Sequence, residues 1–261
     1  MDLQLKDKII IVSGGAKGIG AAISKALANE LAHPIIIGRK EKDNNALVNE
    51  IRATGKKADC FTAELTNPEE CKNVVNAIIK KFSTIHGLVN NAGVNDNVGL
   101  QNGNYQNFMD SLHKNLVHYY LLAQQSLPEL IRNKGSIVNI GSKVAETGQG
   151  NTSGYAASNG ARNALTREWA VELLKHEVRV NAVIVAESFT PLYQSWISTF
   201  TNPAEKLKTI TDKIPFGKRM TTVDEIASMV IFLLSQVSSH TTGQLIHVDG
   251  GYVHLDRAIT S

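Results

Sequence analysis

Three glycines follow the first apolar run of the chain at a spacing that suits the binding of phosphate groups. The run Lys8–Ser13 leads into Gly14, Gly18 and Gly20, and a helical pattern begins there. Gly14 permits a tight turn, Gly18 lets the backbone approach a diphosphate, and Gly20 lets the helix pack closely on the strand. The first N–H groups of the helix and its positive dipole end would then face the phosphates. The segment therefore predicts a dinucleotide site.

The end of the second strand-like run, Pro34–Gly38, bears on which dinucleotide is bound. A site for NAD commonly has an acidic residue there, which binds the 2′-hydroxyl of the adenosine ribose. This chain has Arg39 instead, and Lys17 lies within the glycine loop. A guanidinium and an ammonium suit the 2′-phosphate of NADP; the alternative is that both are solvated surface cations. We expect NADP to be preferred and NAD to remain possible.

The order of the elements predicts where these residues lie. Short β-branched runs alternate with amphipathic stretches, and the expected strands are Lys8–Ser13, Pro34–Gly38, Lys57–Thr62, Gly87–Asn90, Gly135–Ile140, Val178–Val185 and Gln244–Val248. Helical patterns lie near residues 19–32, 43–54, 67–81, 105–133, 153–175 and 222–236. The strand-like runs are strongly apolar, as in strands that are buried on both faces. We predict an α/β fold in a single domain, residues 1–261, with a Rossmann-type, doubly wound, parallel seven-stranded sheet and helices on both faces.

Composition and charge argue against several classes of protein. The net charge of +3 is small and the basic residues are scattered, so nucleic-acid binding is not expected. No apolar run approaches the roughly 20 residues that span a bilayer, and no secretory signal precedes the first strand. We therefore expect a soluble, cytoplasmic protein without membrane contact. No set of His, Cys and carboxylate residues is spaced like metal ligands, so no metal is expected.

Short motifs further along the chain resemble those of the short-chain dehydrogenase/reductase family. The family's glycine motif corresponds to Ser13–Gly20, and its NNAG motif is intact at residues 90–93. Its active-site Asn, Ser and Tyr match Asn115, Ser142 and Tyr155, and the last two are thirteen residues apart, as the family pattern requires. The resemblance implies binding of a nicotinamide dinucleotide. It implies cofactor contacts from Ile19 within the glycine motif and, beyond it, from Glu64, Leu65, Asn91, Ala92, Gly93, Tyr155 and Asn159.

Longer stretches, among them residues 147–155, 165–170 and 249–258, are similar to bacterial L-fucose dehydrogenases. Such enzymes oxidise the anomeric carbon of L-fucose or a related aldose to a lactone, so the resemblance implies a sugar substrate. It also implies a homotetramer or homodimer that packs the helices near 105–133 and 153–175 in pairs. Residues 252–257 would then reach a neighbouring active site.

The chemistry of the family makes a demand on Tyr155. A base must take the hydroxyl proton while a hydride leaves the same carbon, yet a phenol with an ordinary pKa of about 10 is almost wholly protonated at neutral pH. The family lowers this pKa with a lysine one helical turn later, which also binds the nicotinamide ribose. By the same resemblance, Ser142 holds the substrate oxygen and Asn115 anchors a water that leads to solvent.

This chain departs from that pattern, because Asn159 stands at the lysine position. An amide can bind the ribose but carries no charge. At about 5 Å and an effective dielectric of about 20, the loss of one cation weakens stabilisation of the phenolate by roughly 3 kcal/mol, or about 2 pKa units.

Three interpretations of this departure remain open. The chain is a slow enzyme with an alkaline optimum, an inactive form that still binds the cofactor, or an enzyme in which another cation replaces the lysine. Lys143 and Arg162 are the nearby candidates for that cation, although both could simply be solvated. We expect weak activity that rises with pH and that Asn159→Lys increases.

Residues 186–221 follow the sixth strand and interrupt the alternation of strands and helices. An insertion at this end of a doubly wound sheet lies over the ligand crevice, so we interpret it as the substrate-covering segment. Its hydroxyls, carboxylate and aromatic rings suit a compact polyol, although the rings could equally form an ordinary packing stripe. The expected substrate contacts are Ser142, Gln149, Tyr155, Glu187, Tyr193 and Trp196.

The start of this segment also departs from the family, because Val185 and Ala186 stand where the family has Pro-Gly. We still expect Ser188 and Thr190, just beyond, to contact the nicotinamide.

Two other functions compete with sugar oxidation. One is reduction of another small carbonyl, such as a 3-oxoacyl thioester. The other is a dinucleotide-binding protein that lost catalysis together with its lysine.

Overall fold

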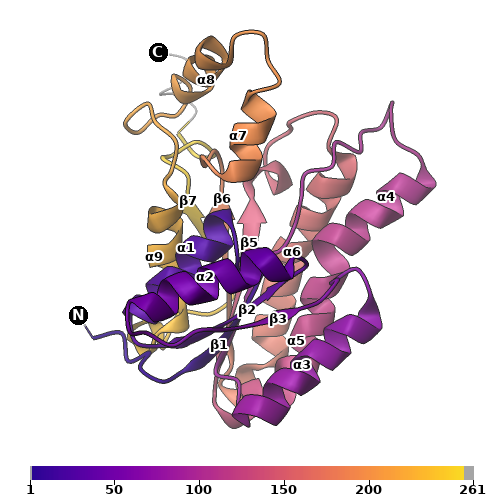
Figure 1. Cartoon of the computed structure of the whole chain (residues 1–261). Helices are drawn as coiled ribbons and strands as arrows, with labels where there is room; N and C mark the ends of the chain where they lie inside the picture. Colours follow the sequence, from indigo (N-terminus) through magenta and orange to yellow (C-terminus); the bar gives the residue numbers. More distant parts are fainter. Residues whose placement is uncertain (1, 256–261) are drawn as a thin grey trace.

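The computed structural model describes residues 2–255, and its centre is one parallel sheet of seven strands (Figure 1). The strands lie in the order β3-β2-β1-β4-β5-β6-β7. Their bounds are β1 Ile9–Ser13, β2 His33–Gly38, β3 Asp59–Thr62, β4 Gly87–Asn90, β5 Ser136–Ser142, β6 Arg179–Val185 and β7 Leu245–Val248. The α-helices are α1 Gly18–Asn29, α2 Glu41–Ala53, α3 Pro68–Phe82, α4 Tyr105–Leu112, α5 His118–Arg132, α6 Ser153–Glu172, α7 Pro191–Ile197, α8 Pro203–Thr211 and α9 Val223–Leu234. The predicted doubly wound, seven-stranded parallel sheet is confirmed.

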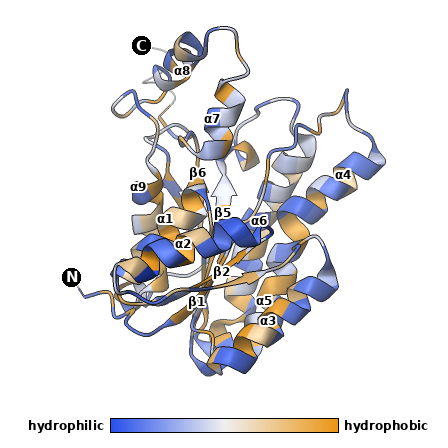
Figure 2. Cartoon of the chain, in the orientation of Figure 1, coloured by the Kyte–Doolittle hydropathy of each residue, from blue (hydrophilic) through white to orange (hydrophobic). Residues whose placement is uncertain are grey.

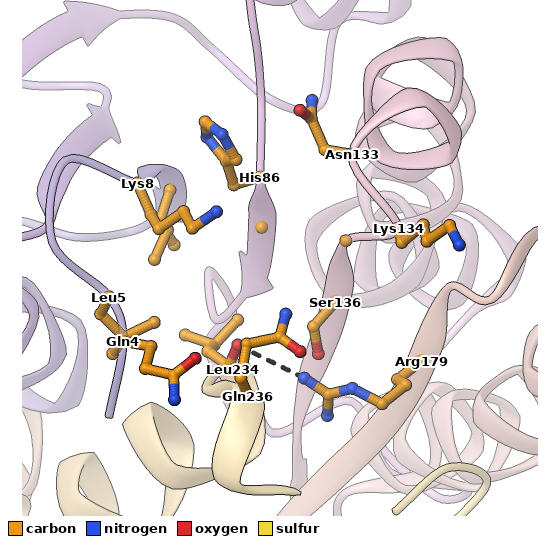
Figure 3. A pocket seen from close by; sticks show the side chains of 13 residues that line it. Gln4, Leu5, Lys8, His86, Asn133, Lys134, Ser136, Arg179, Leu234 and Gln236 are labelled. Carbon is orange, nitrogen blue, oxygen red and sulfur yellow. Dashed lines mark hydrogen bonds between the residues drawn. The ribbon is translucent and has the colours of Figure 1, made fainter. Parts of the chain in front are cut away.

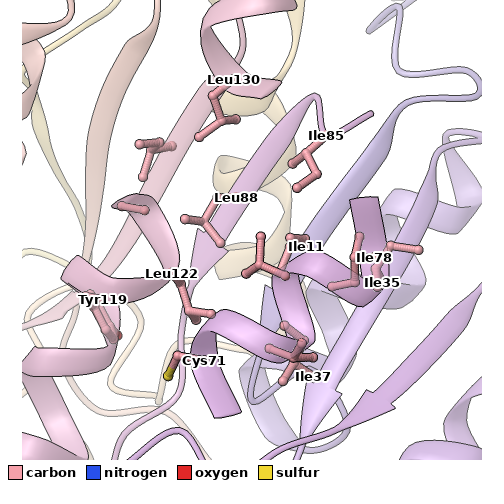
Figure 4. Packing of buried hydrophobic residues seen from close by; sticks show 14 of the residues in the cluster. Ile11, Ile35, Ile37, Cys71, Ile78, Ile85, Leu88, Tyr119, Leu122 and Leu130 are labelled. Carbon is pink, nitrogen blue, oxygen red and sulfur yellow. The ribbon is translucent and has the colours of Figure 1, made fainter. Parts of the chain in front are cut away.

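Both faces of the sheet are covered, because successive residues of a strand point to opposite sides. In β1, Ile9 and Ile11 belong to a core with α3, α5 and α6, which Figure 4 shows from close by. Ile10 and Val12 belong to a core with α1 and α9, and α2 packs over Ile36 in a smaller one. The helices carry both hydrophobic and hydrophilic residues (Figure 2). Within residues 2–255, none has the length and apolarity that crossing a membrane requires.

The order of the strands reverses at β1, which is where a ligand crevice forms in such a sheet. β1 pairs with β2 on one side and with β4 on the other, so the loops after β1 and β4 leave the sheet in opposite directions. The carboxyl ends of β5 and β6 continue the same edge, with Ser142 opposite Val185. This edge collects the glycine loop, residues 90–93 and the start of the 186–221 segment.

Two helical regions differ from the expected pattern. The stretch predicted as one helix near 105–133 is α4, a π-helical turn at His113–Val117, and α5. A π turn inserts a residue without ending the helix, so the apolar periodicity does not reveal it. In the 186–221 segment, α7 and α8 stand beyond the carboxyl ends of β5 and β6 (Figure 1). Each begins with a proline and a capping side chain, Thr190 and Asn202 respectively.

Candidate active site

The backbone of the glycine loop has the geometry that a diphosphate needs. Gly14 and Gly18 have φ values of 62° and 53°, a region that residues with a Cβ rarely adopt. A Cβ on Gly20 would lie 2.1 Å from the carbonyl oxygen of Gly14, so only glycine fits there. The Asn91 amide donates to the carbonyls of Ser13 and Gly14 at 3.0 and 3.2 Å, which ties the NNAG segment to the loop.

The amino end of α1 is open to an anion. Lys17, at the N-cap position, makes no capping side-chain hydrogen bond, whereas side chains cap α3, α4, α7, α8 and α9. The first N–H groups of α1, from Gly18 and Ile19 onward, are thus available to phosphates. The buried hydroxyl of Ser188 has no hydrogen-bond partner among residues 2–255. Thr190 contacts the loop, since a Cβ on Gly18 would lie 3.4 Å from the Thr190 Cβ. These features fit a nicotinamide dinucleotide.

The two basic residues expected beside the 2′-phosphate lie at the surface. The Arg39 side chain is 72% exposed and lies 3.6 Å from Glu64. The Lys17 ammonium lies 2.8 Å from Asp43, and its hydrogen bond holds the pKa of that carboxyl below the usual range. Both cations therefore lie beside surface carboxylates rather than in the core, and a phosphate would compete with Asp43 and Glu64 for them. Leu65 packs its side chain into the core, which leaves only its backbone for a ligand.

The two expected catalytic hydroxyls come from the end of β5 and the first turn of α6. Ser142 and Tyr155 are both partly buried. Within the described chain, the Ser142 hydroxyl makes only a weak hydrogen bond, from the N–H of Val144 at 3.5 Å, so it can still bind a substrate oxygen. The loop between the two residues carries Gln149, which is exposed.

Asn115 is fully buried and braces the segment after β4. Its side-chain oxygen accepts a hydrogen bond from the N–H of Val94 at 2.7 Å, and its NH2 group donates to the carbonyl of Ser111 at 3.0 Å. A Cβ on Gly93 would lie 3.0 Å from the Asn115 oxygen, so Gly93 permits this contact. On the other side of the loop, the N–H of Ala92 donates to the hydroxyl of Ser13. The Asn115 side chain therefore holds the crevice wall together.

At the lysine position, Asn159 is fully buried and joins Tyr155 to Arg162. Its NH2 group donates to the backbone carbonyl of Tyr155 at 2.8 Å, and its oxygen accepts from the Arg162 guanidinium at 3.0 Å. Arg162 is only 3% exposed and also donates to the carbonyls of Asn115 and Ile140. The alternative that Arg162 is merely solvated is wrong.

Lys143, the other candidate cation, is also buried rather than solvated. Its ammonium lies 2.5 Å from the Glu187 carboxylate, and the two side chains are 10% and 16% exposed. It also lies 3.8 Å from the centre of the Tyr252 ring. Tyr252, expected to reach a neighbouring active site, thus contacts Lys143 of its own chain, while residues 256 and 257 of that expected segment lie outside the described residues.

The aromatic residues of the 186–221 segment form a stack. Tyr193 and Trp196 meet edge to face at 5.1 Å, and Trp196 meets Phe200 in the same way at 5.0 Å. The Tyr193 hydroxyl is buried and lies near the Glu187 carboxylate, but within the described part of the chain it makes no hydrogen bond of regular geometry. Burial, together with the nearby Glu187 carboxylate, raises the pKa of Tyr193, so this hydroxyl stays protonated.

A small hollow at the opposite end of the strands is a structural feature (Figure 3). Arg179 reaches into it and donates to the carbonyls of Leu233, Leu234 and Ser235. These are carbonyls at the carboxyl end of α9, where a cation offsets the negative end of the helix dipole. The charge of Arg179 is therefore used within the fold.

Comparison with known proteins identifies the family. A family model described as enoyl-(acyl carrier protein) reductase matches residues 14–253. The chain belongs to the short-chain dehydrogenase/reductase family. A 3-oxoacyl-(acyl-carrier-protein) reductase of Thermotoga maritima is 33% identical over 96% of this chain and 100% of its own length. An L-fucose dehydrogenase of Oryctolagus cuniculus is 31% identical over 94% of this chain and 84% of its own length.

Solved structures of short-chain dehydrogenases/reductases share the whole architecture. A structure described as Cj0485 dehydrogenase has a TM-score of 0.94 and 43% identity, covering 99% of this chain and 98% of that one. The ligand-free aldohexose dehydrogenase of Thermoplasma acidophilum has a TM-score of 0.88 and 29% identity, covering 97% and 96%. An actinorhodin polyketide ketoreductase solved with NADPH has a TM-score of 0.90 and 25% identity, covering 95% and 98%. The chain is an oxidoreductase of a family that binds nicotinamide dinucleotides.

Proposed function

We propose that this short-chain dehydrogenase/reductase oxidises a sugar hydroxyl with NAD(P). The substrate we propose is L-fucose or a related aldose, whose anomeric carbon is oxidised to give a lactone. The observation that carries this is the buried hydroxyl of Tyr193 in the substrate-covering segment, which makes no hydrogen bond of regular geometry among the described residues although the Glu187 carboxylate is near. A buried hydroxyl without a partner costs about 1–3 kcal/mol, which a hydroxyl of the substrate would recover. The Tyr193 and Trp196 rings beside it suit the C–H faces of a sugar. Relatives named L-fucose dehydrogenase and aldohexose dehydrogenase agree with this class.

The residues of the chain divide the chemical work. Ser142 would hold the substrate oxygen through its nearly free hydroxyl, and the Tyr155 phenolate would take the hydroxyl proton. Bound nicotinamide dinucleotide supplies the acceptor for the hydride. Asn159 would bind the nicotinamide ribose, while Ser188 and Thr190 would bind the nicotinamide itself. The buried wall around Asn115 keeps these groups in place.

We propose NADP as the preferred cofactor, with NAD as a weaker substitute. Arg39 and Lys17 are exposed cations at the expected end of the adenosine ribose, and one structural neighbour was solved with NADPH. Arg39→Ala should raise the KM for NADP about tenfold and leave the KM for NAD nearly unchanged, because an ion pair with a phosphate is lost. Equal effects on both cofactors would refute this assignment.

The substrate is tested by turnover of L-fucose with NADP against reduction of an acetoacetyl thioester with NADPH. We expect turnover of the sugar, and Tyr193→Phe should raise the KM for it about tenfold because one buried hydrogen bond is lost. The second candidate, a 3-oxoacyl-type reductase, is favoured by the Thermotoga relative and would show the opposite preference. Tight NADPH binding without turnover of either compound up to pH 10 would indicate a dinucleotide-binding protein without catalysis.

We also propose that the protein is a homodimer or homotetramer that pairs α5 and α6. Tyr120 on α5 is 48% exposed and Val171 on α6 is 68% exposed, which a partner helix would cover. Light scattering coupled to size exclusion tests this, and a monomer at micromolar concentration would contradict it.

A further inference from the structure

The guanidinium of Arg162 is a buried charge without a counter-ion. Two of its nitrogens donate to the carbonyl of Asn115, one of them at 2.7 Å, and a third donates to Ile140 at 3.1 Å and to Asn159 at 3.0 Å. Its carbon lies 4.2 Å from the centre of the Tyr119 ring. In residues 2–255 it forms no ion pair, so its positive charge is not cancelled. A buried charge of this kind is costly and is retained only where it is fully hydrogen-bonded.

The π-helical turn provides the place for this charge. A π turn leaves carbonyl oxygens without their regular helical donors. In His113–Val117 two of these backbone oxygens have side-chain partners. The carbonyl of Lys114 lies 2.9 Å from a ring nitrogen of His118, and the carbonyl of Asn115 accepts from Arg162. By the family resemblance, the Asn115 region carries the water that leads to solvent. In this chain the Arg162 guanidinium donates hydrogen bonds to the backbone carbonyl of Asn115.

The guanidinium also determines how Asn159 is oriented. A guanidinium can only donate hydrogen bonds, so the atom of Asn159 that faces it must be the oxygen. The NH2 group then faces Tyr155, where one hydrogen binds the backbone carbonyl. The other hydrogen has no partner in the described chain, and because the side chain is fully buried a ribose hydroxyl would reach it only after neighbouring side chains move. Because Arg162 fixes this orientation, Asn159 presents a hydrogen-bond donor at the lysine position, as a lysine would.

The other titratable groups around this site are either uncharged at pH 7 or paired with an opposite charge. Burial raises the pKa of Tyr119 to about 12, and its ring packs against the Arg162 guanidinium. Burial lowers the pKa of His118 to about 4, so it is neutral at pH 7. Lys143 is neutralised by Glu187 at the other side of the site.

We propose that Arg162 replaces the lysine that the family places one helical turn after its active-site tyrosine. It supplies the positive charge that favours the Tyr155 phenolate, and it orients Asn159 towards the nicotinamide ribose. This rests on the proposed function only in its assignment of roles to Tyr155 and Asn159. Arg162 is a positioning residue, because it acts through these two side chains. The chain is then an active enzyme, and its motif differs only in where the cation is attached to α6.

The proposal changes what Asn159→Lys should do. The longer lysine side chain would remove the Asn159 oxygen that now accepts from the guanidinium at 3.0 Å and would bring a second cation into the same buried region. Two adjacent buried cations repel each other, so this variant alone should melt at a lower temperature and turn over no faster than the wild type. The double variant Asn159→Lys/Arg162→Gln should recover both stability and turnover relative to either single change.

Titration of Tyr155 provides a readout that needs no substrate. The tyrosinate absorbance of each protein is measured against pH and compared with the same protein carrying Tyr155→Phe. The two residues are seven positions apart on α6, about 10 Å along the helix, so Arg162→Gln should need a higher pH than the wild type to form the tyrosinate. The kcat–pH profile should move in the same direction, with about a tenfold loss at pH 7. Arg162→Lys should keep most of the effect, and Arg167→Gln, an exposed arginine on the same helix, should have none.

The proposal would be overturned if folded Arg162→Gln showed the same Tyr155 titration as the wild type. It would also be overturned if the effects of the two substitutions simply added in the double variant and Asn159→Lys alone turned over faster than the wild type. Absence of sugar turnover in the wild type together with the expected Tyr155 shift would instead contradict only the proposed substrate.

A second, independent observation concerns three side chains outside this site. Potential ligand atoms of Glu146, His247 and His254 all lie within 4.8 Å of one another. The His247 ring nitrogen is 3.0 Å from the Glu146 carboxylate, and the two histidine rings pack edge to face at 4.5 Å. Ligands at about 2.0–2.1 Å around a tetrahedral zinc ion are roughly 3.3 Å apart, so a small side-chain movement would suffice.

We infer that Glu146, His247 and His254 bind a divalent transition-metal ion such as zinc, with a solvent molecule completing the tetrahedron. Because Glu146 begins the loop that leads to Gln149, the metal would join this loop to β7 and to the segment after it. The cavity beside the three ligands is open and partly lined by Arg167, whose charge opposes a cation and weakens binding.

The test titrates the metal-free full chain with Zn2+ by calorimetry and with Co2+ by visible absorption. We expect one Zn2+ per chain and a tetrahedral Co2+ spectrum, with at least tenfold weaker binding in His247→Gln and in His254→Gln. His240→Gln, an exposed single histidine, serves as the matched control and should leave binding unchanged. No saturable binding, or equal losses in all three variants, would overturn the inference.

Discussion

Removing the carboxylate of Glu187 should destabilise the protein far more than removing a carboxylate at the surface. The Lys143 ammonium is 2.5 Å from Glu187, and both side chains are mostly buried. With an effective dielectric of about 20, the Coulomb attraction at this distance is roughly 7 kcal/mol, and desolvation of the two ions offsets much of it. Glu187→Gln leaves the ammonium buried and unpaired except for the Tyr252 ring, whose contribution is about 1–2 kcal/mol.

We therefore expect Glu187→Gln to lower the free energy of unfolding by about 3 kcal/mol. For a chain of this size that corresponds to a fall in Tm of about 9 °C. The matched control is Asp212→Asn, which breaks an exposed pair with Lys208 and should cost at most about 0.5 kcal/mol. Replacing both buried partners, in Lys143→Met/Glu187→Met, should recover part of the loss, because no uncompensated charge remains.

Thermal and urea unfolding followed by circular dichroism measure these differences. Equal losses in Glu187→Gln and Asp212→Asn would refute the argument, since burial would then make no difference to the pair. A double variant less stable than Glu187→Gln would show that the pair itself, rather than the orphaned ammonium, dominates.

Three further predictions follow from the geometry. Tyr155→Phe should reduce kcat at least 100-fold with little change in Tm, because the proton acceptor is lost while the fold is not; turnover within tenfold of the wild type would remove Tyr155 from the mechanism. Gly20→Ala should prevent dinucleotide binding, since its Cβ would overlap the Gly14 carbonyl, whereas Gly160→Ala on α6 meets no atom within 4 Å and should stabilise the protein by about 0.5–1 kcal/mol; calorimetry and melting curves distinguish the two. Burial alone would raise the pKa of Asp59, but hydrogen bonds from Lys81 and His33 hold it below its ordinary value. Since the folded pKa is depressed, the stability that Asp59 contributes is present above about pH 4 and is lost as the pH falls through the folded pKa. Asp59→Asn should therefore make Tm depend less on pH over this titration, between roughly pH 5 and pH 3.

Local patterns in the chain were sufficient for much of the fold and for the approximate place of the site. Apolar runs separated by amphipathic stretches predicted the strands, and the glycines predicted the loop after β1. These signals are local, because backbone conformation at Gly14 and periodicity in β1 depend on neighbouring residues. The same information could not detect the π turn at His113–Val117, which adds one residue to an otherwise continuous helix.

Burial and partnership of the charged side chains were decided only by the tertiary structure. Arg162 donates to a carbonyl 47 residues away, and Lys143 pairs with a carboxylate 44 residues away. Glu146 and His247, separated by 101 residues, have no spacing that sequence could have read as metal ligands. Whether a polar side chain is solvated or buried depends on which distant segments supply its hydrogen bonds. That information is absent from any short stretch of the chain and arises only when α5, α6 and the strand ends pack together.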